Sequence, residues 1–367
     1  MSAGPGGAPP LRVGVVGYGL AGRVFHAPLV TRTPGLTLAA VATGNAERAA
    51  QVADRYPGAR VVARAEALWE GPDAVDVVVV ASPNATHAAL AAAALDAGRH
   101  VVVDKPVAPT AAEVRALADR ARRAGRLLVP FQNRRWDGDF LTVRRLVADG
   151  ALGTVHRFES RFDRWRPGGP RAAWKDDPAA GGLLLDIGAH LVDQALALFG
   201  PVADVRRDVY GEVRRLRAGG RADDDWFLAL THASGVVSHL AATLHDAAPG
   251  LRFRVLGSAG AYEKRGLDPQ EAQLGAGLAP GDAGYGEEPA GAWGALTLGT
   301  PDGAGAARPV PTEPGAYGAF YAAVRDAALG VGPPPVTPEE AALGLDVLEA
   351  ARGAGLARST ALTGFTG

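Results

Sequence analysis

The stretch Leu11–Gly22, LRVGVVGYGLAG, decides the fold class. Its first six residues form a short apolar run, and the glycine pattern GYGLAG follows directly. Apolar residues at helical spacing continue in RVFHAPLV, and a second apolar run, LTLAAVA, begins at Leu36. A strand, a glycine turn, a helix and another strand within about 30 residues predict a dinucleotide-binding unit.

Each glycine of this turn has a physical task in such a unit. Gly17 allows the tight turn, Gly19 lets the backbone approach a pyrophosphate, and Gly22 permits close packing of the helix on the strand. The N–H groups at the start of the helix would then bind the phosphates. The alternative is a glycine-rich turn in an ordinary α/β protein, and the flanking strand and helix favour the binding interpretation.

Strands and helices continue to alternate beyond Leu36. We predict helices at residues 46–55, 86–97 and 111–124, and strands at residues 75–81, 100–103 and 127–131. Near-continuous valine runs in these strands are typical of a parallel sheet that is buried on both faces. We therefore expect an α/β fold with a doubly wound parallel sheet, a Rossmann domain that binds NAD(P), over residues 11–131.

The pattern changes after Phe131. A helix is predicted at residues 139–149, and alternating strands at residues 155–163, 226–231, 236–243 and 251–257. Runs of strands with few helices predict an α+β domain with a large, mostly antiparallel open sheet, which we assign to residues 132–367 and to substrate binding and oligomerisation. Residues 1–10, MSAGPGGAPP, lack the apolar core of a signal peptide and are interpreted as a disordered tail.

The composition excludes several classes of function. The 38 basic and 39 acidic residues nearly cancel, so capture of nucleic acid or of a membrane surface is not expected. No apolar run approaches the roughly 18 residues that a membrane span needs. The chain has no cysteine, which excludes disulfides, thiolate catalysis and cysteine-bound metal, and suits a cytoplasmic location.

The end of the second predicted strand bears on cofactor choice. An acid about 20 residues past the glycine motif would bind the ribose hydroxyls of NAD. This chain has Thr43, Gly44 and Asn45 there instead. A missing carboxylate leaves room for the 2′-phosphate of NADP, and Arg48 could supply positive charge, although a solvated helix position also explains that arginine. We predict NADP, with NAD as the alternative.

Two further stretches place polar groups in apolar surroundings. Lys105 follows the valine run of VVVDKPVAP, at the carboxyl end of a predicted strand, where open α/β sheets bind ligands. Asp186, His190 and Asp193 have the i, i+4, i+7 spacing of one helix face within an otherwise apolar segment. A solvated face, a two-ligand metal site and an acid/base pair are the three interpretations of that stripe, and we expect no metal because no further ligands are obvious.

Together, three motifs resemble the glucose–fructose oxidoreductase/inositol dehydrogenase (Gfo/Idh/MocA) family. They are GYGLAG at Gly17–Gly22, DKP at Asp104–Pro106 and DIGAH at Asp186–His190. QNRRWDGDF at Gln132–Phe140 and GLDPQE at Gly266–Glu271 resemble the branch that contains NADP-dependent scyllo-inositol dehydrogenases. The resemblance covers most of the chain and implies a Rossmann domain followed by an α/β domain whose open sheet forms homodimers or homotetramers.

The resemblance also implies the catalytic residues. The family's catalytic lysine falls on Lys105, and its acid and histidine fall on Asp186 and His190. Asp104 stands where the family has glutamate, and this shorter side chain puts the anchor of the lysine in question. His190 would accept the hydroxyl proton and Lys105 would stabilise the developing charge on oxygen, or the two roles are exchanged. Asp186 would bind substrate hydroxyls or hold His190.

The remaining candidates are cofactor and substrate contacts. The predicted cofactor contacts are Gly17, Tyr18, Gly19, Leu20, Ala21, Gly22, Thr43, Gly44, Asn45, Arg48, Ala81, Ser82, Pro83, Asn84, His87, Asp104, Lys105, Pro106, Asn133 and Arg134. The predicted substrate contacts are Lys105, Trp136, Asp163, Trp165, Asp186 and His190, with Arg161 and Trp174 as further candidates. A structural role is the alternative for each of the arginines and tryptophans and for Asp163.

We therefore expect an NAD(P)-dependent oxidoreductase that acts on a CH–OH group of a cyclic polyol or sugar. One alternative is an enzyme of the same family that cleaves glycosides with the help of a bound nicotinamide. The other is a sensor of sugars and nucleotides without catalysis.

Overall fold

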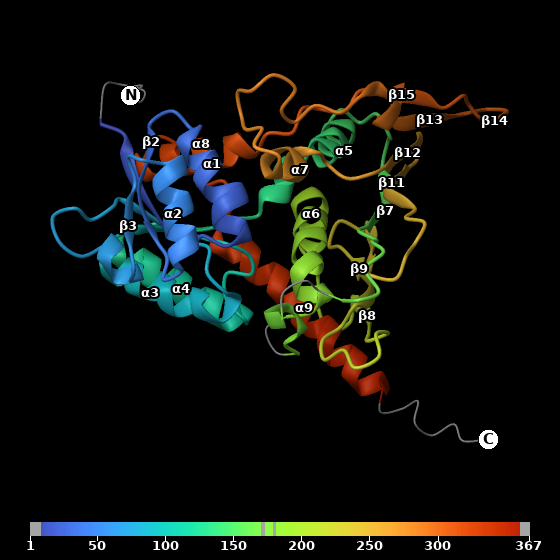
Figure 1. Ribbon diagram of the computed structural model, residues 1–367. Helices are drawn as coiled ribbons and strands as arrows, with labels where there is room; N and C mark the ends of the chain where they lie inside the picture. The colour runs from blue at the N-terminus through green and yellow to red at the C-terminus, as the bar shows by residue number, and fades with distance from the viewer. Residues whose placement is uncertain (1–8, 170–172, 179–180, 360–367) are drawn as a thin grey trace. The chain divides into compact units, whose positions relative to one another are not determined.

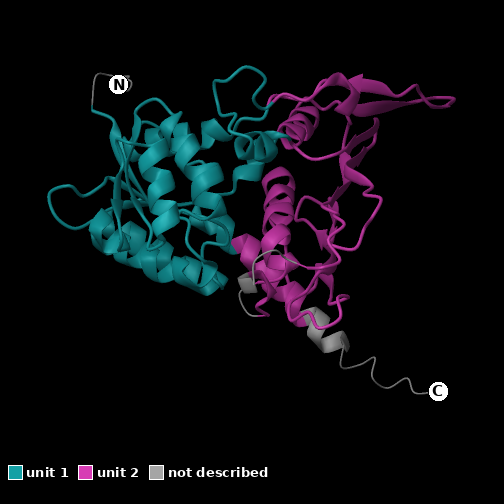
Figure 2. Cartoon of the chain, in the orientation of Figure 1, with its two compact units in different colours: residues 1–137, 269–286, 315–342 teal, residues 138–268, 287–314, 343–367 magenta. Residues whose placement is uncertain are grey.

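The computed structural model describes residues 9–169, 173–178 and 181–359. Most of the predicted tail, residues 1–8, lies outside them. The chain forms two compact units (Figure 2). Unit 1 comprises residues 1–137, 269–286 and 315–342, and unit 2 comprises residues 138–268, 287–314 and 343–367. Two later segments of the chain therefore complete the unit that begins at the N-terminus.

Unit 1 contains a six-stranded parallel sheet with the strand order β3-β2-β1-β4-β5-β6 (Figure 1). Its strands are β1 (Leu11–Val16), β2 (Leu36–Ala42), β3 (Arg60–Val62), β4 (Val77–Val80), β5 (His100–Val103) and β6 (Leu128–Pro130). All four valines of β4 are buried, as expected for a strand covered on both faces. This strand order is that of a doubly wound dinucleotide-binding fold, so the predicted Rossmann sheet is confirmed.

Helices cover this sheet on both faces. The principal helices of unit 1 are α1 (Ala27–Thr31), α2 (Ala46–Arg55), α3 (His87–Asp96), α4 (Ala111–Ala124), α7 (Gln270–Gly275) and α8 (Tyr317–Ala328). Helices α3 and α4 pack against each other (Figure 1). A capping box between Thr110 and Glu113 begins α4, and Gly125, at φ 60°, ends it. Phe320 of α8 packs edge-on against Phe131 at 4.9 Å, so a helix from late in the chain completes the Rossmann core.

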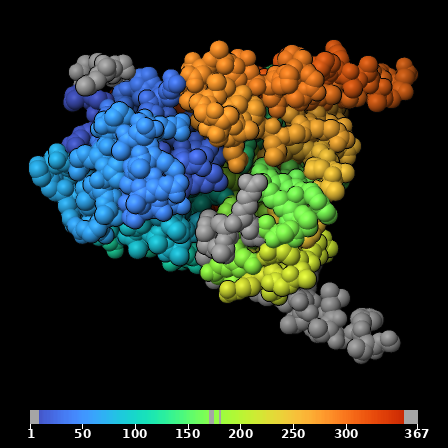
Figure 3. Space-filling view, in the orientation of Figure 1, coloured from blue at the N-terminus to red at the C-terminus, as the bar shows by residue number. Residues whose placement is uncertain are grey.

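Unit 2 is built on a nine-stranded sheet with the order β14-β13-β12-β11-β7-β10-β9-β8, and β15 pairs with β13. Its strands are β7 (Val155–Arg161), β8 (Val209–Arg214), β9 (Asp225–Thr231), β10 (Val237–Thr243), β11 (Leu251–Gly257), β12 (Gly260–Arg265), β13 (Gly294–Thr300), β14 (Gly303–Ala304) and β15 (Arg308–Val310). Only β7 and β10 pair in parallel, so the predicted mostly antiparallel sheet is confirmed. Strands β13 and β14 stand out from unit 2 as a narrow ribbon (Figure 3).

Residues of β9 and β10 alternate between buried and half-buried, because one face of the sheet packs on helices. Helix α6 (Ala189–Phe199) contacts β7 and β10, and α5 (Gly138–Ala148) precedes β7 in the chain. The long helix α9 (Pro338–Ser359) begins in unit 1 and continues into unit 2. Among the described residues, no helix combines the length and the apolar character that crossing a membrane requires.

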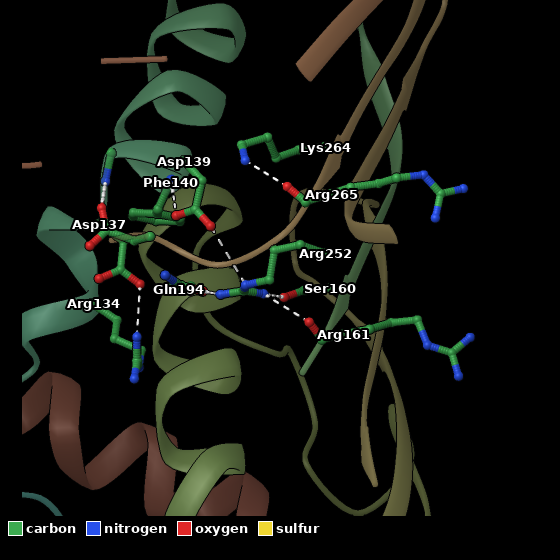
Figure 4. Close-up of polar contacts among 12 residues, drawn as sticks. Arg134, Asp137, Asp139, Phe140, Ser160, Arg161, Gln194, Arg252, Lys264 and Arg265 are labelled. Atoms are coloured by element: carbon green, nitrogen blue, oxygen red, sulfur yellow. Dashed lines mark hydrogen bonds and ion pairs between the residues drawn. The ribbon is translucent and has the colours of Figure 1, made fainter. Parts of the chain in front are cut away.

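A buried polar network lies under the sheet of unit 2 (Figure 4). Arg252 of β11 donates to the Gln194 side chain at 2.9 Å and to the Ser160 hydroxyl at 2.5 Å. Its Nε lies 3.7 Å from the carboxylate of Asp139, which is fully buried. The Arg252 guanidinium also stacks 4.0 Å from the ring centre of Phe253. One arginine thus ties α5, α6 and β7 to β11.

Candidate active site

The glycine turn has the geometry that its sequence predicts. Gly17 adopts φ +93°, and a Cβ there would lie 2.7 Å from the carbonyl oxygen of Ala81, just after β4. A Cβ on Gly22 would lie 2.1 Å from the carbonyl oxygen of Gly17. No described atom lies within 4 Å of a Cβ placed on Gly19, so the backbone is open to a ligand there. The turn is a cradle in which side chains would clash at two positions and a pyrophosphate could approach at the third.

The helix after the glycine turn differs from the regular helix predicted. Gly22–His26 forms a π-helical turn, and α1 begins only at Ala27. Such turns occur often at functional sites. The turn places the imidazole of His26 in the core, where its Nδ1 lies 2.6 Å from the hydroxyl of Tyr321. Burial lowers the pKa of His26 to about 4, so the ring is neutral near pH 7.

A cavity of about 380 Å³ lies beside the glycine turn in unit 1. Its lining residues are Tyr18, Gly19, Leu20, Arg23, Asn45, Glu47, Arg48 and Gln51. Asn45 caps α2, because its side chain accepts a hydrogen bond from the Arg48 backbone N–H at 2.9 Å. Arg23 also lines this cavity but is not among the predicted cofactor contacts, although its position directly after Gly22 is a signal that could have placed it there.

His87 joins the end of β4 to the DKP turn after β5. Its Nδ1 lies 2.8 Å from the carbonyl oxygen of Pro106, and its Nε2 lies 2.8 Å from the carbonyl oxygen of Ser82. The ring is 1% exposed. Both nitrogens therefore face backbone carbonyls of the protein, so His87 links the loop after β4 to the loop after β5. The Asp104 carboxylate accepts a hydrogen bond from the Lys105 backbone N–H at 2.9 Å, and the Lys105–Pro106 peptide is cis.

Residues after β6 form a buried charged cluster in unit 1. Arg134 donates to Asp137 at 3.2 Å and to Glu271 at 2.7 Å, and the Tyr317 hydroxyl donates to Asp137 at 2.6 Å. The carboxylates raise the pKa of Arg134 well above its ordinary value although burial opposes them. Trp136 packs edge-on against Phe320 in the Rossmann core. These contacts give Arg134 and Trp136 a structural role. Arg134 and Trp136 belong to a short 3₁₀ helix, Asn133–Trp136, whose first residue, Asn133, is also buried.

The polar stripe of unit 2 does not lie on one regular α-helix. Leu184–Gly188, which contains Asp186, forms a π-helical turn, and His190 is the second residue of α6. Asp186 and His190 therefore lie on one continuous helical segment, whose first turn is π-helical and whose remainder is α-helical. His190 is buried at 5% exposure, whereas the Asp186 side chain remains 27% exposed. Lys175 Nζ lies 2.6 Å from Asp186 Oδ2, a contact that no sequence signal predicted.

Other predicted substrate contacts follow β7. Asp163 accepts a hydrogen bond from Arg161 Nε at 2.9 Å, and its side chain is 3% exposed. Burial raises the pKa of Asp163 in spite of that arginine. Trp165 is 58% exposed and pairs with His245 through a backbone bridge. The side chain of Trp174 lies outside the described part of the chain.

The predicted site residues thus form two groups. The glycine turn, the loops after β4 and β5 and the helix after β6 lie at the carboxyl edge of the sheet of unit 1. Lys105 belongs to this group, whereas Asp186 and His190 belong to unit 2. In the described part of the chain, no group of three or more His, Cys, Asp or Glu side chains could hold a metal ion.

Comparisons with known proteins find a family match in each of the two units. Residues 11–131 match the family described as "Oxidoreductase family, NAD-binding Rossmann fold", and residues 140–263 match the "GFO/IDH/MocA C-terminal domain". The chain is 40% identical over 343 residues to the uncharacterized oxidoreductase YdgJ of Escherichia coli, covering 92% of this chain and 94% of that protein. The chain belongs to the Gfo/Idh/MocA family.

A second relative and a solved structure are similar to this chain over nearly their whole length. The NADP(+)-dependent scyllo-inositol 2-dehydrogenase IolW of Bacillus subtilis is 32% identical over 347 residues, which cover 93% of this chain and 92% of that protein. The structure of the YPO2259 protein of Yersinia pestis is 40% identical, with a TM-score of 0.87 and 96% coverage of both chains. The chain is therefore an oxidoreductase of this family with an NAD(P)-binding Rossmann domain.

Proposed function

We propose that this protein is an NADP-dependent dehydrogenase that moves a hydride between the nicotinamide and a secondary alcohol carbon of a ring polyol or sugar. The observation that carries the proposal is the position of Lys105. It lies at the same sheet edge as the glycine turn, on a loop that His87 ties to the end of β4. An ammonium group there can meet the oxygen of a substrate held against the cofactor.

When bound, the nicotinamide cofactor would supply the hydride acceptor, and the side chains of this protein would bind the substrate and move its proton. His190 takes the hydroxyl proton, because a neutral imidazole is a base near pH 7. Lys105 donates a hydrogen bond to the reacting oxygen and stabilises its negative charge. Asp186 binds neighbouring hydroxyls. The hydrogen bond from the Lys105 N–H to the Asp104 carboxylate supports the lysine's backbone, although aspartate replaces the family's glutamate.

The cavity beside α2 supports NADP over NAD. Arg23 and Arg48 both line it, and no acid follows β2 at Thr43, Gly44 or Asn45. Two guanidinium groups can pair with a 2′-phosphate, whereas a carboxylate at the end of β2 would repel it. Glu47 also lines the cavity and is the group that most opposes this choice.

The proposed substrate class is based on the relative IolW. IolW is named a scyllo-inositol 2-dehydrogenase (NADP(+)), and the similarity to it covers 93% of this chain. We therefore propose ring polyols such as inositols as the substrate class.

A panel of inositols and sugars, each incubated with purified protein and NADP+ or NAD+, tests the proposal through the absorbance of the reduced nicotinamide. We expect sustained formation of NADPH with at least one inositol. Cleavage of a glycoside without net NADPH formation would favour the glycoside-cleaving alternative, and cofactor binding without any turnover would favour a sensor.

The outer face of the nine-stranded sheet is the proposed oligomer contact. Tyr210 and Phe227 pack 6.4 Å apart on it, and Phe227 packs 5.8 Å from His239. Tyr210 is 36% exposed. Light scattering after size-exclusion chromatography should give a dimer or tetramer, and Phe227→Glu should shift it to monomer. A monomer in the native protein would contradict this assignment.

A further inference from the structure

A lysine of unit 2 that the sequence motifs do not single out, Lys175, lies beside the predicted catalytic acid Asp186. Lys175 is part of a short 3₁₀ helix, Ala173–Asp176, and its Nζ lies 2.6 Å from Oδ2 of Asp186. The two side chains are 30% and 27% exposed, so solutes can reach both.

The backbone holds Lys175 in place on the side of the π-helical turn. Its carbonyl oxygen accepts a hydrogen bond from Gly182 N–H at 2.8 Å. A Cβ on Gly181 would lie 2.4 Å from that same oxygen, so only glycine fits there. The Asp186 N–H in turn donates to the carbonyl oxygen of Gly182 at 3.0 Å. Gly182 thus links the backbone of the lysine directly to that of the acid.

Two aspartates fix the ends of this arrangement. Asp176, next to the lysine, accepts hydrogen bonds from Arg217 Nη2 at 2.6 Å and from the backbone N–H of Ala222 at 3.1 Å. Asp223 accepts one from the backbone N–H of Leu184 at 2.6 Å, at the start of the π-helical turn. Side-chain contacts therefore hold both the residue after Lys175 and the first residue of the π-helical turn that carries Asp186.

Stability alone does not account for this construction. An ion pair with both side chains about a third exposed contributes little to folding, because water screens it. A carboxylate and an ammonium side by side at an accessible place instead offer a strong acceptor next to a strong donor. Adjacent hydroxyl groups on a ring match that pattern, since each can donate to the carboxylate or accept from the ammonium.

We propose that Lys175 is a further residue of the substrate-binding site and, together with Asp186, binds two adjacent hydroxyl groups of a ring polyol. This inference rests on the proposed function and deepens it. The protein would then select its substrates by two adjacent hydroxyl groups, and not by the ring or the reacting carbon alone. A simple ring ketone or alcohol would then be a poor substrate.

The test uses two ketones in the direction of reduction, because a ketone fixes the reacting carbon. Scyllo-inosose is formed when one hydroxyl of scyllo-inositol is oxidised to a ketone, and each of its remaining ring carbons carries a hydroxyl. Cyclohexanone carries no hydroxyl. NADPH consumption is measured for the native protein, Lys175→Met and Lys175→Arg. Arg214→Met is the control, because it removes another solvent-accessible ion pair of unit 2, in which Arg214 is 56% exposed and lies 2.7 Å from Asp225.

We expect Lys175→Met to raise the KM for scyllo-inosose roughly ten- to hundredfold, the usual effect of losing a hydrogen bond to a charged group. Its kcat/KM for cyclohexanone should stay within about twofold of native. Lys175→Arg should recover most of the loss, and Arg214→Met should match the native protein. The Kd for NADPH, measured by fluorescence, should be unchanged in all variants.

An unchanged KM for scyllo-inosose in Lys175→Met would overturn the inference and leave the proposed function intact. So would equal losses for both ketones, or a Lys175→Arg variant as weak as Lys175→Met, since each indicates a structural role. If the protein does not reduce cyclohexanone at all, two results test the inference: the KM for scyllo-inosose in Lys175→Met and its recovery in Lys175→Arg. Native protein that consumes no NADPH with either ketone would contradict the proposed function itself, and with it the role of Lys175.

Discussion

Arg252 of β11 donates a hydrogen bond to Gln194 of α6 at 2.9 Å (Figure 4). Gln194 lies one helical turn after His190 on the same helix. The same guanidinium faces the fully buried carboxylate of Asp139. The strand that crosses below the helix thus sets the position of the segment that carries the predicted base.

Removing this arginine should destabilise unit 2 strongly. Arg252→Ala leaves the Asp139 carboxylate buried without its cation, which costs about 3–5 kcal/mol of unfolding free energy. Arg254→Ala is the control on the same strand. Its side chain is 40% exposed and pairs with Glu263 at 3.0 Å, so the expected loss is below about 1 kcal/mol. Denaturant titrations compare the two, and equal losses would show that the buried network does not hold unit 2 together.

Lys105→Met should lower kcat with little effect on cofactor binding. Losing a donor that stabilises charge on the reacting oxygen typically lowers kcat about 10²–10³-fold. Turnover of the best inositol and the Kd for NADPH are measured on the same preparations. A variant with native kcat would show that Lys105 is not catalytic, and a large loss of NADPH affinity would assign it to the cofactor instead.

Asn45→Asp should shift preference from NADP towards NAD. Aspartate caps a helix as well as asparagine, so α2 keeps its N-terminal hydrogen bond to the Arg48 N–H while a carboxylate is added at the cavity. We expect kcat/KM for NADP to fall roughly tenfold, because the carboxylate repels a 2′-phosphate. Asn45→Ser, a neutral cap, is the control and should keep the native preference. The assignment of this cavity to the 2′-phosphate fails if both variants behave alike.

His26 should make the protein less stable in mild acid. Burial lowers its pKa from an ordinary 6.5 to about 4, outweighing the smaller opposing effect of Asp104. As the pH falls below 6.5 the unfolded chain gains a proton that the folded chain does not, and unfolding free energy drops by about 1.4 kcal/mol per pH unit until about pH 4. Between pH 7 and pH 5 the native protein should lose about 2 kcal/mol more than His26→Gln, whose amide can still bond Tyr321. Parallel pH profiles for the two proteins would exclude this role.

The sequence predicts the fold well where local pattern and packing agree. The valine runs of β4 and β5 can only be buried on both faces of a sheet, and the three glycines of the turn have the packing that their spacing suggests. The sequence does not predict that α8 packs in the Rossmann core. Phe320 and Tyr321 could form the apolar face of a helix packed against either unit.

The site is harder to predict, because its contacts join distant segments. Arg23 and Lys175 are ordinary charged residues in the sequence, and only the fold shows one lining the cavity and the other beside Asp186. The position of His87 in the sequence predicts a cofactor contact, and only the fold shows that both of its ring nitrogens lie beside backbone carbonyl oxygens. The π-helical turn at Asp186 begins at Leu184, whose N–H donates to Asp223, a residue distant in the sequence, and helical periodicity cannot reveal such a turn.

The most direct test of the central claim follows the hydride itself. Scyllo-inositol carrying deuterium on its ring carbons is incubated with NADP+ and the native protein, and the cofactor is analysed by mass spectrometry. Direct transfer predicts reduced cofactor that carries one deuterium from the substrate carbon. Reduced cofactor without deuterium, or no reduction of NADP+ or NAD+ by any inositol, would contradict the account.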